Sequence, residues 1–263
     1  MMINVLLPMA GQSALFDPQL YPYPLPLTEV CGKPLIEHVI TNLQTLDADI
    51  RFIFVVKAED CRRFHLDHTL SLLAPGRCEI VQLAAETKGA LCSAMMAIAH
   101  IANEDPLVVA NFDQLIEPGL GGLFAEFKRK GCDAGCLTFD AVHPRWSYVK
   151  LEGDQVVEAA EKKPISRNAI AGFYYFSSGN LFVEAAKRTI YNGAAVGDLY
   201  YVSLVFNELI LEGKRITSVP IDVQQYHSFY TPQRIEEYER QHLISGAVAK
   251  TAVVRAGYRA AVS

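Results

Sequence analysis

The first 32 residues of the chain contain no lysine or arginine, and the first basic residue is Lys33. This absence is unexpected, because the segment includes Met9-Ala10-Gly11 directly after an apolar run. A glycine-bearing turn between a first strand and a helix is typical of a loop that binds phosphate through backbone N–H groups. The sequence therefore predicts a loop with the shape of a phosphate site but without its usual positive charge.

Other absences exclude whole classes of protein. No apolar stretch approaches the roughly 18–20 residues that span a bilayer, and the N-terminus lacks the basic region of a signal peptide. The net charge of −5 argues against a nucleic-acid partner. The six cysteines are scattered rather than dense, which favours a reducing compartment over a disulfide scaffold. We expect a cytoplasmic protein with neither a membrane nor a nucleic-acid partner.

Strand-like apolar runs alternate with helical patterns through the first half of the chain. Strands that are apolar throughout, with helices between them, indicate a parallel sheet covered on both faces. After Gly131, short runs with brief breaks suggest antiparallel pairing instead. The predicted fold class is α/β, Rossmann-like, with a mixed but mostly parallel sheet. The expected strands cover 3–8, 50–57, 78–84 and 106–113, and the expected helices cover 34–46, 60–74, 89–102, 179–191, 199–213 and 231–244.

No linker or repeat divides the chain. Residues 1–246 are therefore expected to form a single domain, and the small, apolar residues 247–263 to form a tail that packs on the domain or on a partner. The last expected helix has Thr231 as its N-cap and Pro232 at its first position, an arrangement that favours helix initiation.

Three segments follow predicted strands at the edge where ligands bind in open parallel sheets. They are the loop after residues 3–8, the turn at 85–90 and the segment 111–114, so one binding cleft is expected. In the turn, Thr87 and Gly89 fit either a phosphate-binding helix start or an ordinary capped helix. Asp113 fits a Mg²⁺ ligand, with an Asx turn as the alternative.

Glu161 and Lys162 end a later strand before Pro164. A carboxylate beside an ammonium group suits sugar hydroxyls and a phosphate, and a solvated turn is the alternative. Cys61, His65 and His68 share a helix face and resemble metal ligands, but helices of such sheets lie on the outer layer, so an incidental cluster is the preferred interpretation.

Several motifs occur in an order that resembles the sugar-phosphate nucleotidyltransferases, in particular short members tied to capsule and surface-polysaccharide synthesis. The similarity covers nearly all of residues 2–240. It is carried by "LLPMAGQSALF", "LPLTEVCGKPLIEHVI", "ETKGA", "VANFDQL", "WSYVKL", "VVEAAEKKPISRNAIAGFYYF", "YYVSLVFNELILEGKRI" and "YTPQRIEEYE". The resemblance implies a GT-A-like fold and attack of a sugar-1-phosphate oxygen on the α-phosphorus of a nucleoside triphosphate, with release of pyrophosphate.

The resemblance also implies partners and site residues. The partners are a nucleoside triphosphate or nucleotide-sugar and a small phosphorylated substrate, with Mg²⁺ as cofactor; the apolar tail also suits a homodimer. The implied residues are Ala10, Gly11, Gln12, Ser13, Thr87 and Gly89 for the nucleotide, Tyr148, Glu161 and Gly172 for the substrate, Asp113 for the metal, and Lys33, Lys88 and Lys162 for catalysis.

The chain departs from the family pattern at charged positions. Leu15 stands where the family loop Gly-x-Gly-x-Arg has arginine, and Leu25 where a second block has lysine. Ser228 occupies a position that often holds an acidic metal ligand. Lys33 or Lys88 is expected to replace the lost charge if the protein is an active transferase. The alternatives are a non-catalytic relative that binds a nucleotide-sugar and regulates a partner and, third, a glycosyltransferase.

Overall fold

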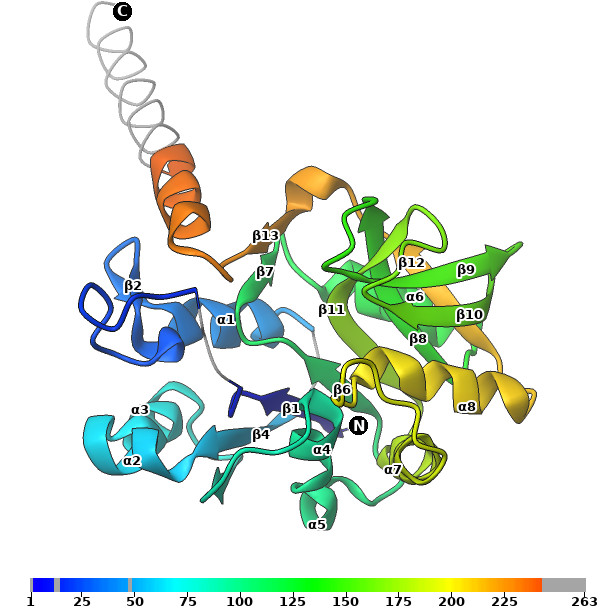
Figure 1. The fold of residues 1–263 in the computed structure, drawn as a ribbon, viewed down its shortest axis with the longest axis horizontal. Helices are drawn as coiled ribbons and strands as arrows, with labels where there is room; N and C mark the ends of the chain where they lie inside the picture. Colours follow the sequence, from blue (N-terminus) through cyan, green and yellow to red (C-terminus); the bar gives the residue numbers. More distant parts are fainter. Residues whose placement is uncertain (1, 12–14, 47–48, 243–263) are drawn as a thin grey trace, which may run out of the picture.

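The computed structural model describes residues 2–11, 15–46 and 49–242 of the chain, and its centre is a nine-stranded sheet (Figure 1). From one edge to the other, the strands are β5 (Cys78–Leu83), β4 (Asp49–Lys57), β1 (Met2–Pro8), β6 (Leu107–Ala110), β11 (Asn168–Phe176), β8 (Ala134–Asp140), β12 (Ile216–Pro220), β10 (Gln155–Glu161) and β9 (Ser147–Glu152).

The run of parallel strands ends at β11, which is antiparallel to both of its neighbours in the sheet. β1 pairs in parallel with β4 and β6, and β4 with β5. β11 runs antiparallel to both β6 and β8, while β12 is parallel to β8 and β9–β10 form an antiparallel hairpin. The prediction of a mixed, mostly parallel sheet with antiparallel pairing after residue 131 is confirmed. The carboxyl ends of β1, β4, β5, β6, β8 and β12 consequently lie along one edge.

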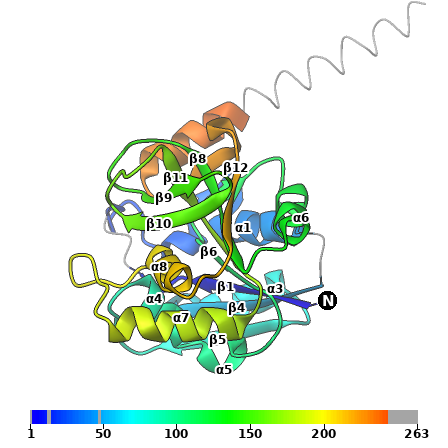
Figure 2. The same ribbon diagram turned by 90° about the vertical axis from the view of Figure 1, so that its right-hand side faces the viewer.

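Helices cover both faces of the sheet (Figure 2). Side chains alternate between faces along a strand, so Val5 and Leu7 of β1 join one apolar cluster and Leu6 joins the other. The first face packs against α1 (Leu35–Gln44), α2 (Ala58–Phe64), α3 (Leu66–Leu73) and α6 (Gly121–Lys130), and the second against α4 (Ala90–Met95), α5 (Ile98–Ile101), α7 (Gly179–Tyr191) and α8 (Val205–Leu211).

Two of the predicted helices are interrupted. The helix expected over 60–74 breaks at His65, whose left-handed backbone (φ 54°) ends α2 with an N–H bond to the Cys61 carbonyl. The helix expected over 89–102 is split into α4 and α5. Its break follows N–H groups of Met96 and Ala97 that donate to carbonyls three residues back, a tightening that ends many helices.

Short elements complete the edge where the strands end. They are η1 (Leu25–Leu27), the hairpin of β2 (Glu29–Val30) and β3 (Lys33–Pro34), η2 (Val202–Leu204), η3 (Val223–Gln225), and the pair formed by β7 (Gln114–Ile116) and β13 (Tyr226–Ser228). A closing helix starts at Pro232, as predicted, and runs to 242. The predicted tail, 247–263, lies outside the described residues. Within the described ranges, no helix combines the length and apolar character needed to cross a membrane.

Candidate functional site

The loop after β1 and the ends of β4 and β6 meet in one small cavity. Gly11, Lys57 and Phe112 line it, and they follow β1, end β4 and follow β6, respectively. The remaining lining residues come mainly from the proline-rich segment: Met9, Phe16, Pro18, Tyr21, Tyr23, Pro24, Leu25, Pro26 and Asp60. Two of the three segments predicted to converge therefore do so. Gln12 and Ser13 lie outside the described residues.

Lys57 provides the positive charge that the loop lacks. Leu15 and Leu25 carry no charge; Leu25 is buried in η1, and Leu15 is exposed. Among the described residues that line the cavity, Lys57 is the basic one. Burial raises the pKa of the Asp60 carboxyl, and the positive charge of Lys57 partly offsets this increase. The sequence contained the signal, because Lys57 is the last residue of a buried strand and therefore lies at the same edge of the sheet as the loop.

Thr87 and Gly89 lie in the turn before α4 and pack against a neighbouring loop. The Thr87 hydroxyl lies 2.6 Å from Ser93 Oγ and donates to the Gly89 carbonyl at 3.1 Å. Gly89 has φ 97°, and a Cβ atom there would lie 2.4 Å from the Tyr200 carbonyl oxygen. Close approach of Tyr200 therefore accounts for this glycine. The turn is absent from the lining of the Lys57 cavity in the described structure.

Asp113 lies between β6 and β7. Its carbonyl accepts a 2.7 Å bond from the Phe229 N–H, which ties the segment to the residues after β13. Burial raises the pKa of the Asp113 carboxyl, and the nearby Arg145 guanidinium partly offsets this. Ser228 pairs with Gln114, the residue after Asp113. A neutral hydroxyl thus occupies the strand beside the proposed metal ligand.

Gly172 supports the same segment from β11. Its carbonyl accepts the Asn111 N–H at 2.9 Å, and its backbone is left-handed with φ 57°. A Cβ atom at this position would lie 2.4 Å from both Asn111 Nδ2 and Gln114 Oε1. The absence of a side chain at Gly172 is therefore what allows the segment before and after Asp113 to pack on β11.

Glu161 and Lys162 lie at the end of β10. The nearly buried Glu161 carboxylate accepts hydrogen bonds from the Ser203 hydroxyl at 2.8 Å and from the Ser147 hydroxyl. Burial raises the pKa of Glu161, and the two hydroxyls and Lys162 partly offset it. Lys162 Nζ donates to the Tyr201 hydroxyl at 2.7 Å. The solvated-turn alternative does not describe Glu161, which is enclosed and polar-bonded.

Three other predicted site residues have structural partners. Tyr148 is fully buried, and its hydroxyl donates to the His143 carbonyl at 2.7 Å. Lys33 forms a 2.6 Å ion pair with Glu37 and lines a different cavity, beside α1. Lys88 is exposed. Burial raises the pKa of the Cys92 thiol, and the charge of Lys88 partly offsets this. Neither Lys33 nor Lys88 joins the cavity that holds Gly11 and Lys57.

The donor set for a metal ion is small. Within residues 2–11, 15–46 and 49–242, no group of three or more His, Cys, Asp or Glu side chains is arranged to hold a metal. Cys61, His65 and His68 therefore do not form such a group. Mg²⁺ is commonly bound by one or two carboxylates together with substrate phosphates and water. Asp113 therefore fits Mg²⁺ only as part of a metal–nucleotide complex.

Comparison with known proteins identifies the family. The family model described as "MobA-like NTP transferase domain" matches residues 21–179, which begins after the Gly11 loop. A search of curated proteins found no significant match.

Solved structures share the fold. A nucleoside-diphosphate-sugar pyrophosphorylase from Vibrio cholerae RC9 is 23% identical, with a TM-score of 0.77 over 90% of this chain and 99% of that one. A UDP-glucose pyrophosphorylase complexed with UDP-glucose is 16% identical (TM-score 0.74; 93% and 100% covered). A UTP-bound UGPase from Acinetobacter baumannii is 14% identical (TM-score 0.72; 97% and 99% covered). With its family match covering more than half of its length, the chain belongs to the MobA-like NTP transferase domain family, which confirms the nucleotidyltransferase resemblance of its motifs.

Proposed function

We propose that the protein transfers a nucleotidyl group from a nucleoside triphosphate to a sugar-1-phosphate or a similar phosphorylated metabolite, releasing pyrophosphate. One observation carries the proposal: Lys57 lines the same cavity as Gly11 and Leu25. A transferase needs positive charge beside the triphosphate, and Lys57 supplies it from β4 where the loop has leucine. A role in surface-polysaccharide precursor synthesis follows from the motif resemblance alone.

In this proposal, the residues that bind the nucleotide and those that bind the acceptor have separate tasks. Backbone groups of Ala10 and Gly11 approach the nucleotide, and Lys57 neutralises phosphate charge. Mg²⁺, held by Asp113 together with the nucleotide phosphates, would supply further neutralisation of the phosphate oxygens. Glu161 and Lys162 orient the acceptor, with Lys162 near its phosphate. Thr87 and Gly89 shape the turn beside the nucleotide rather than carrying charge to it.

The reaction requires little covalent chemistry from the protein. An oxygen of the acceptor phosphate forms a bond to the α-phosphorus, and the bond from that phosphorus to the bridging oxygen of pyrophosphate breaks. Pyrophosphate leaves with the electron pair of the broken bond. Such reactions are accelerated mainly by positioning and charge neutralisation. The rate is therefore expected to depend on the cationic side chains of Lys57 and Lys162.

Lys57→Gln tests this assignment. We expect pyrophosphate release to fall by about 10- to 100-fold, because one charge–phosphate interaction is lost while the side chain keeps much of its length. Release is measured by a coupled phosphate assay with each nucleoside triphosphate and a panel of sugar-1-phosphates. Lys187→Gln is the matched control, since Lys187 is exposed on α7 and paired with Glu184 at 2.7 Å.

The same assay decides between turnover and binding alone. Equal rates for Lys57→Gln and the wild-type protein would remove Lys57 from the mechanism. Ser228 is the specific observation that favours the non-catalytic alternative, because it leaves Asp113 as the lone carboxylate of the proposed metal site. Wild-type protein that is stabilised by a nucleotide-sugar but releases no pyrophosphate with any triphosphate would establish that alternative in place of our proposal.

A further inference from the structure

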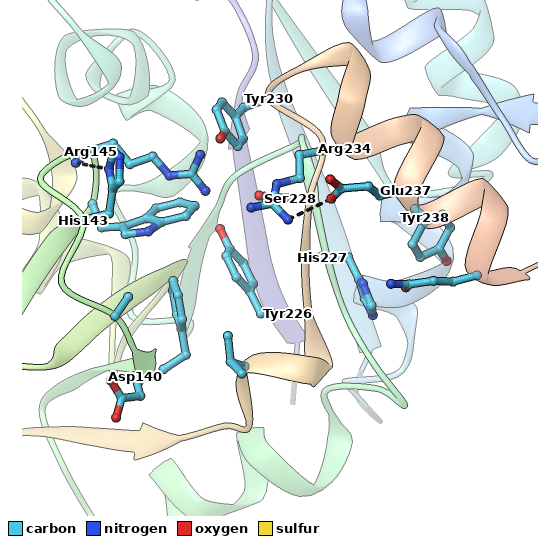
Figure 3. A pocket seen from close by; sticks show the side chains of 15 residues that line it. Asp140, His143, Arg145, Tyr226, His227, Ser228, Tyr230, Arg234, Glu237 and Tyr238 are labelled. Atoms are coloured by element: carbon cyan, nitrogen blue, oxygen red, sulfur yellow. Dashed lines mark hydrogen bonds and ion pairs between the residues drawn. The ribbon is translucent and has the colours of Figure 1, made fainter.

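The cavity of about 460 Å³ where β8 ends belongs to the proposed site (Figure 3). Ser228 and Arg145 line it, and the Arg145 guanidinium lies near the Asp113 carboxyl. The rings of Trp146 and Tyr230 flank this guanidinium, with centroids 3.9 and 3.8 Å from its Cζ atom. A different feature of the molecule, the edge of the sheet at β5, has no part in that site.

β5 is the outermost strand at one end of the sheet, next to β4 (Figure 2). The two strands are parallel, and the Phe52 N–H donates to the Arg77 carbonyl at 3.0 Å where their ladder begins. In a parallel ladder, one residue directs both its N–H and its C=O to the same neighbour, and the next residue directs both the other way. Arg77 and the odd-numbered residues after it therefore bond β4, while Cys78, Ile80 and Gln82 direct their backbone groups outward.

The outward groups of β5 have no backbone partner in the part of the chain that the structure describes. No strand lies beyond β5 in the sheet, and none of the backbone hydrogen bonds outside the sheet involves Cys78, Ile80 or Gln82. Gln82 is exposed, and the other two residues are half-buried. An accessible row of unpaired N–H and C=O groups is a template for pairing with another strand.

β5 also lacks the features that usually protect an edge strand. It contains no lysine or proline, and its register with β4 is uninterrupted. Its charged residue, Glu79, pairs with Arg51 at 2.9 Å. The opposite edge differs, because β9 carries the exposed Lys150 and its partner β10 is bulged between Val156 and Glu158. Lysines and bulges discourage pairing at an edge, so β9 is protected and β5 is not.

The outward groups of β5 match a second copy of the same edge. A two-fold axis perpendicular to the sheet places β5 antiparallel to itself. With the axis beside Ile80, the two Ile80 residues exchange N–H···O=C bonds, and Cys78 exchanges them with Gln82 of the partner subunit, giving about six bonds. Glu79 then lies opposite Val81 of the partner subunit, so no like charges face each other. Because the outward residues are symmetric about Ile80, the edge is its own complement, which favours a second copy over an unrelated strand.

We propose that the protein forms a homodimer in which two β5 strands pair antiparallel across a two-fold axis at Ile80, joining two sheets into one. The inference goes beyond the proposed function, because this pairing requires neither a nucleotide nor turnover. Two short strands form an interface at the small end of the range for protein complexes. We therefore expect a concentration-dependent dimer with a dissociation constant of about 1–100 μM.

Hydrogen exchange at β5 tests the pairing directly. In the monomer, the Val81 N–H is bonded to β4 and exchanges slowly, whereas the Ile80 N–H faces solvent and exchanges fast. We would measure site-resolved exchange of the full chain at about 0.5 μM and about 500 μM, on either side of the expected dissociation constant, and follow the mass by sedimentation. Protection of the Ile80 amide should rise with the dimer fraction, while Val81 stays protected throughout. A protein that remains monomeric at the higher concentration, or a dimer with an unprotected Ile80 amide, would overturn the proposal.

Gln82→Pro separates pairing from folding. Proline removes an N–H that β4 does not use, and edge strands accept proline where the missing N–H faces solvent. The dimer loses the bond that Gln82 donates from each copy, so the dissociation constant should rise by about 10- to 100-fold. Gln82→Ala keeps the N–H at the same exposed position and should dimerise as the wild-type protein does. Circular dichroism and melting temperature establish that both variants are folded. An unchanged dissociation constant in folded Gln82→Pro contradicts the β5 interface, and if that variant does not fold, exchange at Ile80 in the wild-type protein decides.

Discussion

Asp113→Asn is expected to lower magnesium-dependent pyrophosphate release by about 100- to 1,000-fold, the range typical of losing one group that stabilises charge in a transition state. The reason is that Asp113 is the lone carboxylate proposed for the metal, with Ser228 on the adjacent strand contributing only a hydroxyl. The substitution keeps the side-chain shape and the backbone bond from Phe229 to the Asp113 carbonyl, so the fold should be preserved.

Two measurements separate a metal role from a structural one. Release is followed over a magnesium titration, and nucleotide-induced thermal stabilisation is compared with and without magnesium. Asp113→Asn should lose the magnesium-dependent part of the stabilisation while keeping the melting temperature of the unliganded protein. Asp154→Asn, in an exposed ion pair with Arg215, is the control. Wild-type magnesium dependence in Asp113→Asn would assign the metal to other groups.

Gly172→Ala is expected to destabilise the protein by about 2–4 kcal/mol. The left-handed backbone at φ 57° costs an alanine about 1 kcal/mol, and forcing a methyl into a filled space typically adds about 1–3 kcal/mol. The space is filled because the new Cβ would lie 2.4 Å from Asn111 Nδ2 and from Gln114 Oε1. The Gln114 side chain donates a hydrogen bond to the Ala171 carbonyl and accepts one from the Tyr226 hydroxyl. Displacing Gln114 should therefore also disturb the packing next to Asp113.

The matched control is Gly153→Ala. Gly153 has φ 61°, nearly the same backbone strain, but no atom lies within 4 Å of its added Cβ. Chemical denaturation should give a loss of about 1 kcal/mol for Gly153→Ala and a clearly larger loss for Gly172→Ala. Equal losses would mean that backbone strain alone, and not packing against the Asp113 segment, explains the glycine.

The sequence predicted those features that follow from strand order. Parallel strands place their carboxyl ends together, so the meeting of the Gly11 loop with the residues around Asp113 could be predicted from the alternation of strands and helices. The same logic applies to Lys57, which ends β4 and therefore lies at the same edge of the sheet although it is outside the loop motif. Charge supplied from another strand is found by comparing all strand ends, not by inspecting one motif.

Other features depend on packing that no local pattern reveals. Tyr148 belongs to an aromatic segment of the motif, yet alternation along β9 directs it into the core, where it bonds a carbonyl. Arg145 is an ordinary loop residue in the sequence, and only the fold brings the ring of Tyr230, 85 positions later, to 3.8 Å from its Cζ atom. The break at His65 likewise depends on a backbone conformation rather than on side-chain periodicity.

The position of β12 and β13 late in the chain sets an order of assembly. β1, β4, β5 and β6 are all synthesised by residue 110, so the half of the sheet that carries Gly11 and Lys57 can form early. β8 can pair with β12 only after about eighty further residues have been synthesised. Arg145 can contact the ring of Tyr230 only after residue 230 has been synthesised. A chain cut after Pro220 would lack β13 and Tyr230, so Arg145 would keep its contact with Trp146 but lose the one with Tyr230.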